Sequence, residues 1–259
     1  MVKKSYRYIY GPVASWRLGR SLGIDPISSE EKVCTFDCVY CQAGAKKASA
    51  QKRKVFVPTK AIIEEIKSLP RIKIDYVTFS GKGEPTLAKN LGEIIKEIRK
   101  IHKERTAIIT NASLMDRQDV QEDLRLIDFV MAKFDACSEE LLNRINRPEK
   151  GMKFERILKG INEFRIGYKG KFALQIMFVE DNKKRAYGLA EMARKINPDE
   201  VQLNTPLRPC PVKPLSKKDI DEIKKYFSGM NIVSVYDSVR KKTDPLDKEQ
   251  TLKRRGAYD

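Results

Sequence analysis

An alternation of short apolar segments with amphipathic segments is the feature of this sequence that most limits its possible folds. Each apolar segment is rich in β-branched or aromatic residues and is bounded by polar, glycine or proline residues, as buried strands are. In the segments between them, apolar residues recur every three or four positions, which is typical of a helix with one buried face. The predicted strands are residues 21–27, 74–80, 106–111, 128–134, 172–179, 200–206 and 231–237, and the predicted helices are residues 60–69, 91–102, 154–164, 185–196 and 216–227.

This alternation predicts an α/β fold with a parallel sheet and right-handed crossovers. The nearly continuous apolar strands need cover on both faces, so the sheet either curls into a barrel or forms an open, doubly wound sheet. In both cases we expect functional side chains at the carboxyl ends of the strands. Tyr6, Tyr8 and Tyr10 alternate as in an additional N-terminal strand. With no evident internal repeat or linker, we expect one domain over residues 1–259.

The charge is strongly basic and unevenly distributed. Lys and Arg total 52 against 35 acidic residues, a formal net charge of +17. Residues 1–20 and 42–60 contain no acid, and the last twenty residues are also rich in Lys and Arg. The excess fits either a heat-adapted surface or a surface that binds a polyanion such as RNA. We expect residues 43–54 to form a mobile loop and the last twenty residues to form a loosely held basic tail.

Several classes of protein are disfavoured by what the sequence contains. No apolar run is long enough to span a bilayer, and the first residues lack the apolar stretch of a secretory signal. We therefore expect a cytoplasmic protein without membrane contact, in which cysteine thiols stay reduced. The one histidine, His102, lies in a charged helical segment, which disfavours histidine-based acid–base or triad catalysis. No phosphate-binding P-loop pattern is present.

Three cysteines follow the first predicted strand closely. Cys34, Cys38 and Cys41 have the spacing C-x3-C-x2-C. Iron–sulfur clusters are held by cysteine thiolates, and three thiolates leave one iron of a four-iron cluster open, as catalytic metals require. The alternative is a structural zinc site completed by Cys137 or Cys210, although zinc sites more often combine two C-x2-C pairs. The two remaining cysteines are too few for a second cluster bound by four thiolates, so we expect one cluster.

The cysteine spacing, with Tyr40 directly before the last cysteine, resembles the signature of the radical S-adenosylmethionine (SAM) superfamily. The segment "SGKGEPT" follows the second predicted strand and resembles the Gly-Gly-Glu segment of that family. The resemblance implies that Gly81, Gly83 and Glu84 contact the amino group of the methionine moiety. Glycines let the backbone approach a ligand closely, and a carboxylate accepts hydrogen bonds from an ammonium group. Lys82, between the two glycines, departs from the family pattern.

The resemblance covers about residues 8–210 and implies a partial (β/α)6 barrel with N-terminal strands and a C-terminal βα extension over about residues 211–259. In the family, polar residues at strand ends contact the ribose and carboxylate of SAM. Asp135 is the favoured ribose ligand, with a helix N-cap as its alternative role. The other candidates could instead belong to the barrel interior. The candidate cofactor-binding residues outside the glycine segment are Tyr40, Asn111, Lys133, Asp135, Gln175 and Asn204.

The resemblance also implies the cofactors and the reaction. The cofactors are a [4Fe-4S] cluster and SAM. A low-potential electron donor reduces the cluster, and reductive cleavage of SAM then yields a 5′-deoxyadenosyl radical that removes a hydrogen atom from the substrate. Cys210 follows the sixth predicted strand and is the candidate catalytic residue, either as a hydrogen-atom donor or as a site of covalent attachment. Arg17, Gly19 and Arg20 could shape the cluster face or bind anions, or they could simply belong to a basic β-turn and the start of a strand.

A finer resemblance suggests the substrate. The segments "GPVASWRLGRSLGIDPI" and "LNTPLRPCP" resemble an archaeal and bacterial subgroup that is loosely grouped with wyosine synthetases, which remodel a guanine in tRNA. Together with the charge, this favours an RNA substrate, namely tRNA, bound by the basic termini and by residues 45–60. One alternative is a protein or peptide substrate, including a glycyl-radical enzyme that is activated. Another is a non-enzymatic metal-binding protein that binds nucleic acid.

Overall fold

The computed structural model describes residues 5–45, 48–50 and 52–255, and its centre is one eight-stranded sheet. β1 and β2 form an antiparallel hairpin, and every later strand pairs in parallel with the strand before it in the sheet. In sheet order the strands are β1 (Ile9–Ser15), β2 (Gly19–Ile24), β5 (Tyr76–Phe79), β6 (Arg105–Thr110), β7 (Phe129–Lys133), β8 (Lys171–Met177), β9 (Glu200–Asn204) and β10 (Ile232–Ser234).

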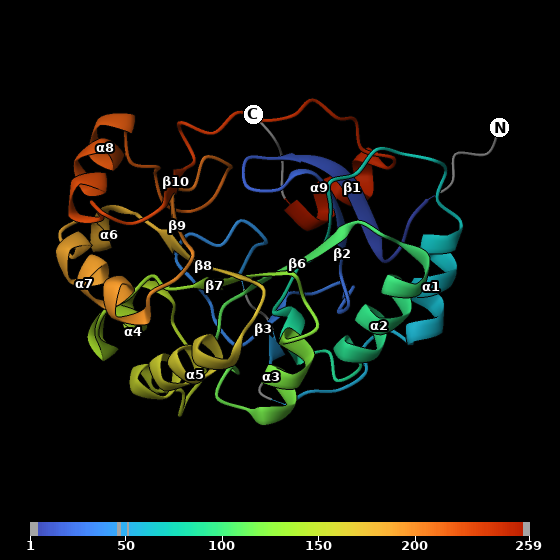
Figure 1. Cartoon of the computed structure of the whole chain (residues 1–259), viewed down its shortest axis with the longest axis horizontal. Coiled ribbons are helices and arrows are strands. Elements are labelled where there is room, and N and C mark those ends of the chain that lie inside the picture. Colours follow the sequence, from blue (N-terminus) through green and yellow to red (C-terminus); the bar gives the residue numbers. More distant parts are fainter. Residues whose placement is uncertain (1–4, 46–47, 51, 256–259) are drawn as a thin grey trace.

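Helices cover the outer face of this sheet, with α1 and α2 over one part of it and α7 and α8 over another (Figure 1). The five predicted helices are confirmed as α1, α2, α5, α7 and α8. A separate pair of short strands, β3 (Val33–Cys34) and β4 (Ala48–Ser49), carries the first cysteine. The helices are α1 (Thr59–Lys67), α2 (Leu91–Ile101), α3 (Gln118–Leu124), α4 (Glu139–Ile145), α5 (Phe154–Gly167), α6 (Glu180–Lys183), α7 (Ala186–Ile196), α8 (Lys217–Tyr226) and α9 (Lys248–Arg255), with a 3-10 turn η1 at Pro85–Leu87.

The strand order distinguishes between the two predicted architectures. A doubly wound sheet reverses its winding direction at a switch point, whereas here each parallel strand lies beside the next one along the chain. The sheet therefore curls in one sense, with β1 and β10 at its two edges (Figure 1). The prediction of a partial barrel with an N-terminal strand and a C-terminal βα extension is confirmed, and β10 provides the extension's strand.

The core lies on both sides of the curled sheet. Between the sheet and the helices, the amphipathic helices bury their apolar faces, as Ile94, Ile95 and Ile98 of α2 show with no exposed surface. Inside the curl is a smaller apolar cluster that includes Leu18 from the β1–β2 turn and Phe129 from β7. This inner cluster fills part of the barrel interior, as side chains do in closed barrels.

The predicted mobile loop over residues 43–54 is corrected by the structure, which ties its far end to the body of the protein. The Arg53 side chain is only 4% exposed, and it forms ion pairs with Asp119 at 2.8 Å and with Asp123. It also donates to the carbonyl oxygens of Thr86 and Ala88, each at 2.9 Å. Residues 46, 47 and 51 of this segment lie outside the described residues.

The predicted loose basic tail is wrong for the described residues up to 255. They include α9, which packs along β1 (Figure 1). Gly11 N donates to Thr251 Oγ1 at 3.1 Å, and the Arg254 guanidinium donates to Arg7 O. Residues 256–259 lie outside the described residues. Within the described part of the chain, the helices are too short or too polar to cross a bilayer.

Candidate active site

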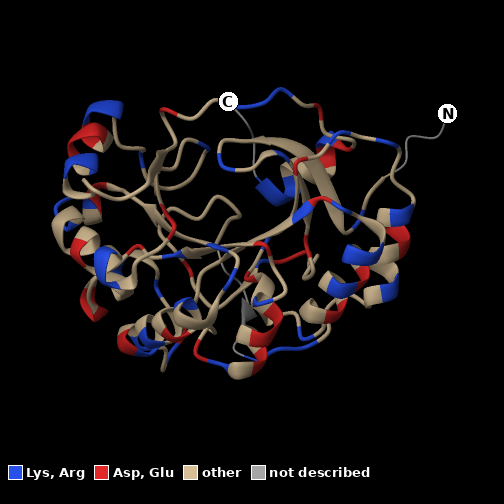
Figure 2. Cartoon of the chain, in the orientation of Figure 1, with Lys and Arg blue, Asp and Glu red and all other residues tan. Residues whose placement is uncertain are grey.

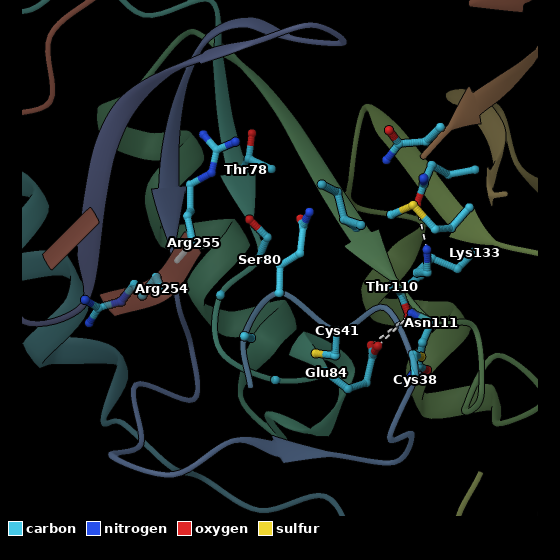
Figure 3. A pocket seen from close by; sticks show the side chains of 18 of the residues that line it. Cys38, Cys41, Thr78, Ser80, Glu84, Thr110, Asn111, Lys133, Arg254 and Arg255 are labelled. Atoms are coloured by element: carbon cyan, nitrogen blue, oxygen red, sulfur yellow. Dashed lines mark hydrogen bonds between the residues drawn. The ribbon is translucent and has the colours of Figure 1, made fainter. Parts of the chain in front are cut away.

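A cavity of 260 Å³ occupies the interior of the curled sheet. Its wall combines the cysteine loop, residues at the ends of β5, β6, β7, β8 and β9, and residues of the C-terminal helix (Figure 3). The parallel strands therefore bring together polar residues that are far apart in sequence, as predicted. The sequence-predicted residues in the wall are Cys34, Tyr40, Cys38, Cys41, Gly81, Gly83, Glu84, Asn111, Lys133, Gln175 and Asn204.

The cysteine loop rests directly on the glycine segment. Glu84 N donates to Val33 O at 3.1 Å, so the backbones of the two segments are joined next to Cys34. A Cβ atom at Gly83 would stand 2.0 Å from Val33 O, closer than atoms can approach. Gly83 is thus required by the approach of the protein's own backbone, a role that sequence reasoning missed. Its predicted contact with methionine stays a prediction.

Gly81 is required by a different neighbour. A Cβ atom there would lie 2.2 Å from Cγ of Asp25, the residue that follows β2. The Asp25 carboxylate accepts hydrogen bonds from the backbone amides of Ile27, Ser28 and Lys82. Asp25 therefore fixes the glycine segment against the end of β2, and the sequence had no feature that singled it out.

Glu84 is buried in the cavity wall and fixed by several donors. Its Oε1 accepts from Thr86 N at 3.1 Å and from the hydroxyls of Thr86 and Thr110, both at 2.7 Å. In the described part of the chain, Oε2 accepts one hydrogen bond, from Asn111 N at 2.7 Å (Figure 3). Burial raises the pKa of the Glu84 carboxyl. A carboxylate oxygen has room for a second donor, so Oε2 is the atom suited to receive an ammonium group.

Tyr40, Lys133 and Asp135 form one buried network beside the cysteine loop. The Tyr40 hydroxyl donates to the Asp135 carboxylate, and Asn146 Nδ2 donates to both groups, at 3.1 and 2.9 Å. Lys133 Nζ lies 3.5 Å from Asp135 Oδ2 and 4.8 Å from the centre of the Tyr40 ring. Met177 N donates to the other oxygen of Asp135 at 2.7 Å.

This network changes the interpretation of Asp135. Its side chain has no exposed surface, and it is not among the residues that line the cavity. The alternative role as a helix N-cap is wrong, because Ser138 caps α4 by accepting from Leu141 N. The carboxylate instead orients Tyr40, which does line the cavity. Contact between Asp135 and a ribose stays a prediction that the observed burial does not support.

The sulfur atoms of the cysteine loop receive weak hydrogen bonds from asparagines. Asn111 Nδ2 lies 3.5 Å from Cys34 Sγ, and Asn146 Nδ2 lies 3.4 Å from Cys38 Sγ. Burial raises the pKa of the Cys34 thiol to about 12, so a bound cation is needed to favour its thiolate. Among the described residues, no three His, Cys, Asp or Glu side chains already converge as ligands of a metal ion. The donor set itself, three unlinked thiols on one short loop, suits an iron–sulfur cluster.

The other two cysteines lie elsewhere. Cys210 is not among the residues lining the cavity, and its thiol donates to Val212 O at 3.1 Å. Cys137 lies near Gly188, where an added Cβ atom would be 3.3 Å from its sulfur. The structure therefore does not bring the predicted catalytic residue Cys210 into the cavity wall, and its catalytic role stays a prediction.

Sequence reasoning named Arg17 as a possible anion-binding residue but missed the other three arginines of the cavity wall. The arginines of the wall come from three separate places: the β1–β2 turn, the loop after β9 and the end of α9, where Figure 3 labels Arg254 and Arg255. The basic tail was the available signal, but it was interpreted as surface charge. These residues are Arg17, Arg208, Arg254 and Arg255.

Comparison with known sequences identifies relatives. The sequence model of the Radical SAM superfamily matches residues 32–193. The chain is 43% identical to a UPF0026 protein of Synechocystis sp., over 79% of this chain and 77% of that protein. It is 38% identical to a UPF0026 protein of Methanocaldococcus jannaschii, over 86% of this chain and 70% of that protein. A probable GTP 3′,8-cyclase of Saccharolobus solfataricus is 24% identical, over 81% of this chain and 65% of that protein.

Comparison with solved structures finds the same fold. The anSMEcpe protein crystallised with AdoMet has a TM-score of 0.61 and 17% identity, covering 83% of this chain and 64% of that one. The crystal structure of archaeal TYW1 has a TM-score of 0.56 and 16% identity, covering 82% of this chain and 72% of that one. The Streptococcus suis protein SuiB, crystallised with its precursor peptide SuiA, has a TM-score of 0.61 and 16% identity, covering 79% of this chain and 47% of that one.

Proposed function

Because this chain belongs to the radical SAM superfamily and to the UPF0026 family, we propose that it cleaves SAM reductively in the cavity of the curled sheet and uses the radical to modify a nucleotide of RNA. The protein is an enzyme, and its cofactors are a [4Fe-4S] cluster and SAM. The observation that carries the proposal is that the three cysteines, the glycine segment and Glu84 line one cavity.

When bound, the cluster and SAM together supply an electron and a 5′-deoxyadenosyl radical, which the polypeptide alone cannot provide. The residues of the chain hold and orient these groups. In this proposal Cys34, Cys38 and Cys41 ligate iron, while Asn111 and Asn146 donate hydrogen bonds to two of the sulfurs. Glu84 Oε2 receives the ammonium group of SAM.

The remaining wall residues would hold the rest of SAM and exclude water. Tyr40 is oriented by Asp135, and Lys133 Nζ donates to Gln175 Oε1 at 3.0 Å, so these side chains are held in place before SAM binds. Asn204 is also fixed, because its Oδ1 accepts from Thr205 N. Preorganised polar groups in a cavity closed to water are what radical chemistry needs, since a stray radical would be quenched.

An RNA substrate is supported by the charge of the chain and by the arginines in the cavity wall. The net charge of +17 provides general attraction to phosphates, and four arginines line the cavity itself. One of the similar proteins bears the name of a nucleotide, the probable GTP 3′,8-cyclase. Arg53 does not contribute to this surface, because its guanidinium is already paired with Asp119 and Asp123.

A peptide substrate is the second candidate. One observation favours it: SuiB, whose fold is similar, was crystallised with a precursor peptide. The predominance of cations in the cavity wall would suit only an acidic peptide. Charge therefore favours RNA over a general peptide substrate.

The test of the reaction is anaerobic reconstitution with iron and sulfide, followed by addition of SAM and a strong reductant. We expect 5′-deoxyadenosine to form, as measured by liquid chromatography and mass spectrometry. The Cys38→Ala variant should bind less iron and form no 5′-deoxyadenosine. The Cys137→Ala variant, which removes a thiol outside the cavity wall, should match the unmodified protein. A reconstituted protein without 5′-deoxyadenosine formation would contradict the proposed reaction.

The RNA proposal has a separate test. Binding of a tRNA transcript, measured by filter retention over a series of salt concentrations, should weaken steeply as salt rises because counterions are released from phosphates. A flat salt response with weak binding would contradict an RNA substrate and favour a peptide, without affecting the proposed cleavage of SAM.

A further inference from the structure

Arg17 is a buried cation whose partner is not found in the described part of the chain. It lies in the turn between β1 and β2, and its guanidinium stacks on the ring of Trp16 at 4.5 Å. Its Nε and Nη1 atoms are buried, and neither has a hydrogen-bond partner among the described residues. A buried charged donor without an acceptor is unfavourable, so its presence in a cavity wall points to a ligand that supplies acceptors.

The acid with the largest electrostatic influence on Arg17 does not serve as its partner. Among carboxylates, Glu200 has the largest influence on Arg17, but its oxygens already accept from other residues. Glu200 Oε2 accepts from Lys171 Nζ at 2.6 Å, and Oε1 accepts from Gln202 Nε2 at 2.7 Å. No ion pair joins Arg17 to Glu200 among the described residues.

The surroundings of Arg17 are positive. Burial, followed by the neighbouring charges of Arg255 and Arg208, lowers the pKa of its guanidinium to about 9. At neutral pH the group is still protonated, so several like charges face one cavity. The Lys and Arg at the end of α9 lie inside the curl of the sheet, next to β1 (Figure 2). An arriving anion would offset this repulsion and raise the pKa of Arg17 again.

Cations outnumber acids in the described part of the cavity wall. Glu84 is the carboxylate there, and its oxygens already accept from Thr86, Thr110 and Asn111. Two of the cations have carboxylate partners behind the wall: Lys133 lies 3.5 Å from Asp135, and Arg254 lies 3.5 Å from Asp25. The cationic wall residues are Arg17, Lys133, Arg208, Arg254 and Arg255.

The position of Arg17 separates it from the cysteines. Arg17 precedes β2, whereas Glu84 follows β5, and β2 and β5 are parallel. The six residues of β2 extend roughly 20 Å at about 3.3 Å per residue, so the two residues belong to opposite ends of the strands. A ligand that contacts Arg17 therefore lies along the barrel interior, with its other end directed toward the cysteine loop.

We propose that Arg17 anchors a phosphate group of the substrate inside the barrel, so that the substrate enters as a nucleotide unit with its phosphate on the arginines and its base or ribose toward the cysteine loop. This inference rests on the proposed function and names the part of the substrate that the same cavity receives. Guanidinium groups bind phosphate through paired hydrogen bonds, which suits an arginine with two unused donors.

Polar groups between the two ends fit the rest of a nucleotide. Gln175 Nε2 is a buried donor in the wall that has no partner among the described residues. Ser21 Oγ and Thr78 Oγ1 form a hydroxyl pair 2.7 Å apart in the same wall. These groups could receive the hydrogen-bonding edge of a base or a sugar hydroxyl, whereas an aliphatic chain would leave Gln175 Nε2 unpaired.

The test uses the fluorescence of Trp16, the one tryptophan of the chain, because it stacks on Arg17. Reconstituted protein is titrated with inorganic pyrophosphate and then with the four nucleoside monophosphates. The Arg17→Gln variant should bind about tenfold more weakly and Arg17→Lys about threefold more weakly, since lysine keeps the charge but loses the paired geometry. The matched control Arg20→Gln removes an arginine of the same hairpin that pairs with Asp75, and it should stay within about twofold.

Two further measurements separate the sources of phosphate. A nucleoside monophosphate that displaces pyrophosphate while RNA does not would identify a free nucleotide as the substrate. Binding of an RNA oligonucleotide that depends on Arg17 would instead identify a nucleotide flipped out of RNA. Both outcomes support the phosphate site, whereas binding of an acidic peptide that displaces pyrophosphate would overturn it.

SAM is the remaining anion source to exclude. SAM binding is therefore measured for the Arg17→Gln variant and for the unmodified protein, to show whether the group that Arg17 holds is the carboxylate of SAM. If Arg17→Gln binds pyrophosphate normally, or if it loses SAM binding instead, the phosphate site is wrong although the proposed reaction stands. If the Arg17→Gln variant does not fold, the test uses the Arg17→Lys variant and the change in Tm of the unmodified protein when pyrophosphate is added. The absence of a rise in Tm would overturn the phosphate site.

Discussion

Arg53 and Arg17 are arginines in two regions of this molecule, and they differ in whether the protein supplies acceptors for their buried guanidinium groups. Arg53 reaches from the segment after the cysteine loop to two carboxylates and two backbone carbonyls. Arg17, in the barrel interior, has two buried nitrogens with no partner among the described residues. The difference indicates that the buried charge of Arg53 stabilises the fold, whereas the guanidinium donors of Arg17 are available to a ligand.

The largest effect that would test this comparison is on stability. Arg53→Gln removes a donor from two carboxylates and two carbonyl groups, of which Asp119 keeps its hydrogen bonds from Arg117. The free energy of unfolding should fall by about 4 kcal/mol. Arg17→Gln loses the stacking on Trp16 but also removes an unpaired charge, so the net change should be less than about 1 kcal/mol. Urea unfolding of both variants measures this. Equal destabilisation would break the comparison and make Arg17 a structural residue.

A smaller effect is expected where the cysteine loop meets the glycine segment. Gly83→Ala places a methyl group against Val33 O, so the free energy of unfolding should fall by about 2 kcal/mol and less iron should bind after reconstitution. Gly167→Ala is the control, because its methyl group would meet only the end of the Arg125 side chain at 3.2 Å. Normal iron content in Gly83→Ala would show that the loop does not depend on this contact.

Removal of one hydroxyl should have a still smaller effect. Tyr40→Phe deletes the hydrogen bond to Asp135, while Asn146 and Lys133 remain beside that carboxylate, so stability should fall by about 1 kcal/mol. Tyr236→Phe deletes a hydrogen bond to Leu215 O outside the cavity and should cost a similar amount. Only Tyr40→Phe should alter the electron paramagnetic resonance spectrum of the reduced cluster. If Tyr40→Phe and the unmodified protein gave identical spectra, the Tyr40–Asp135 network would have no influence on the cluster.

The smallest expected effect is the loss of stability at low pH through Asp119, a partner of Arg53. Hydrogen bonds from Arg117, and then from Arg53, lower the pKa of Asp119 from 3.8 to about 2. Its contribution to stability is therefore present above pH 3.8 and is lost as the pH falls through about 2. Asp119 is partly exposed, so the loss should be below about 1 kcal/mol. Acid unfolding of Asp119→Asn should lack this loss, and an unchanged acid profile would contradict it.

The strands and the main helices could be predicted because their apolar periodicity is strong. The cysteine loop could be placed because functional loops follow the carboxyl ends of parallel strands. α9 could not be predicted, since "KEQTLKRR" has no apolar stripe and docks through polar groups such as Thr251. The boundary between a core at about residues 8–210 and an extension at 211–259 stays a prediction.

The candidate site could be predicted only in part, because composition does not reveal which polar groups pair with one another. Asp135 was chosen for its position after a strand, yet it is used by Tyr40, Asn146 and Lys133. Arg17 and Arg255 are close only because a hairpin turn and a C-terminal helix meet inside the curl. Such contacts join residues more than two hundred positions apart, beyond the reach of local patterns.

The hydrogen bond between Glu84 N and Val33 O makes the two halves of the cofactor pocket move together. With no space for a side chain at Gly83, a displacement of the cysteine loop must also displace the Glu84 carboxylate, which we propose as the acceptor for the amino group of SAM. If both halves bind as proposed, occupancy of either half favours the other. By reciprocity, the cofactor would then raise the affinity of the loop for the cluster by the same factor as the cluster raises the affinity for the cofactor.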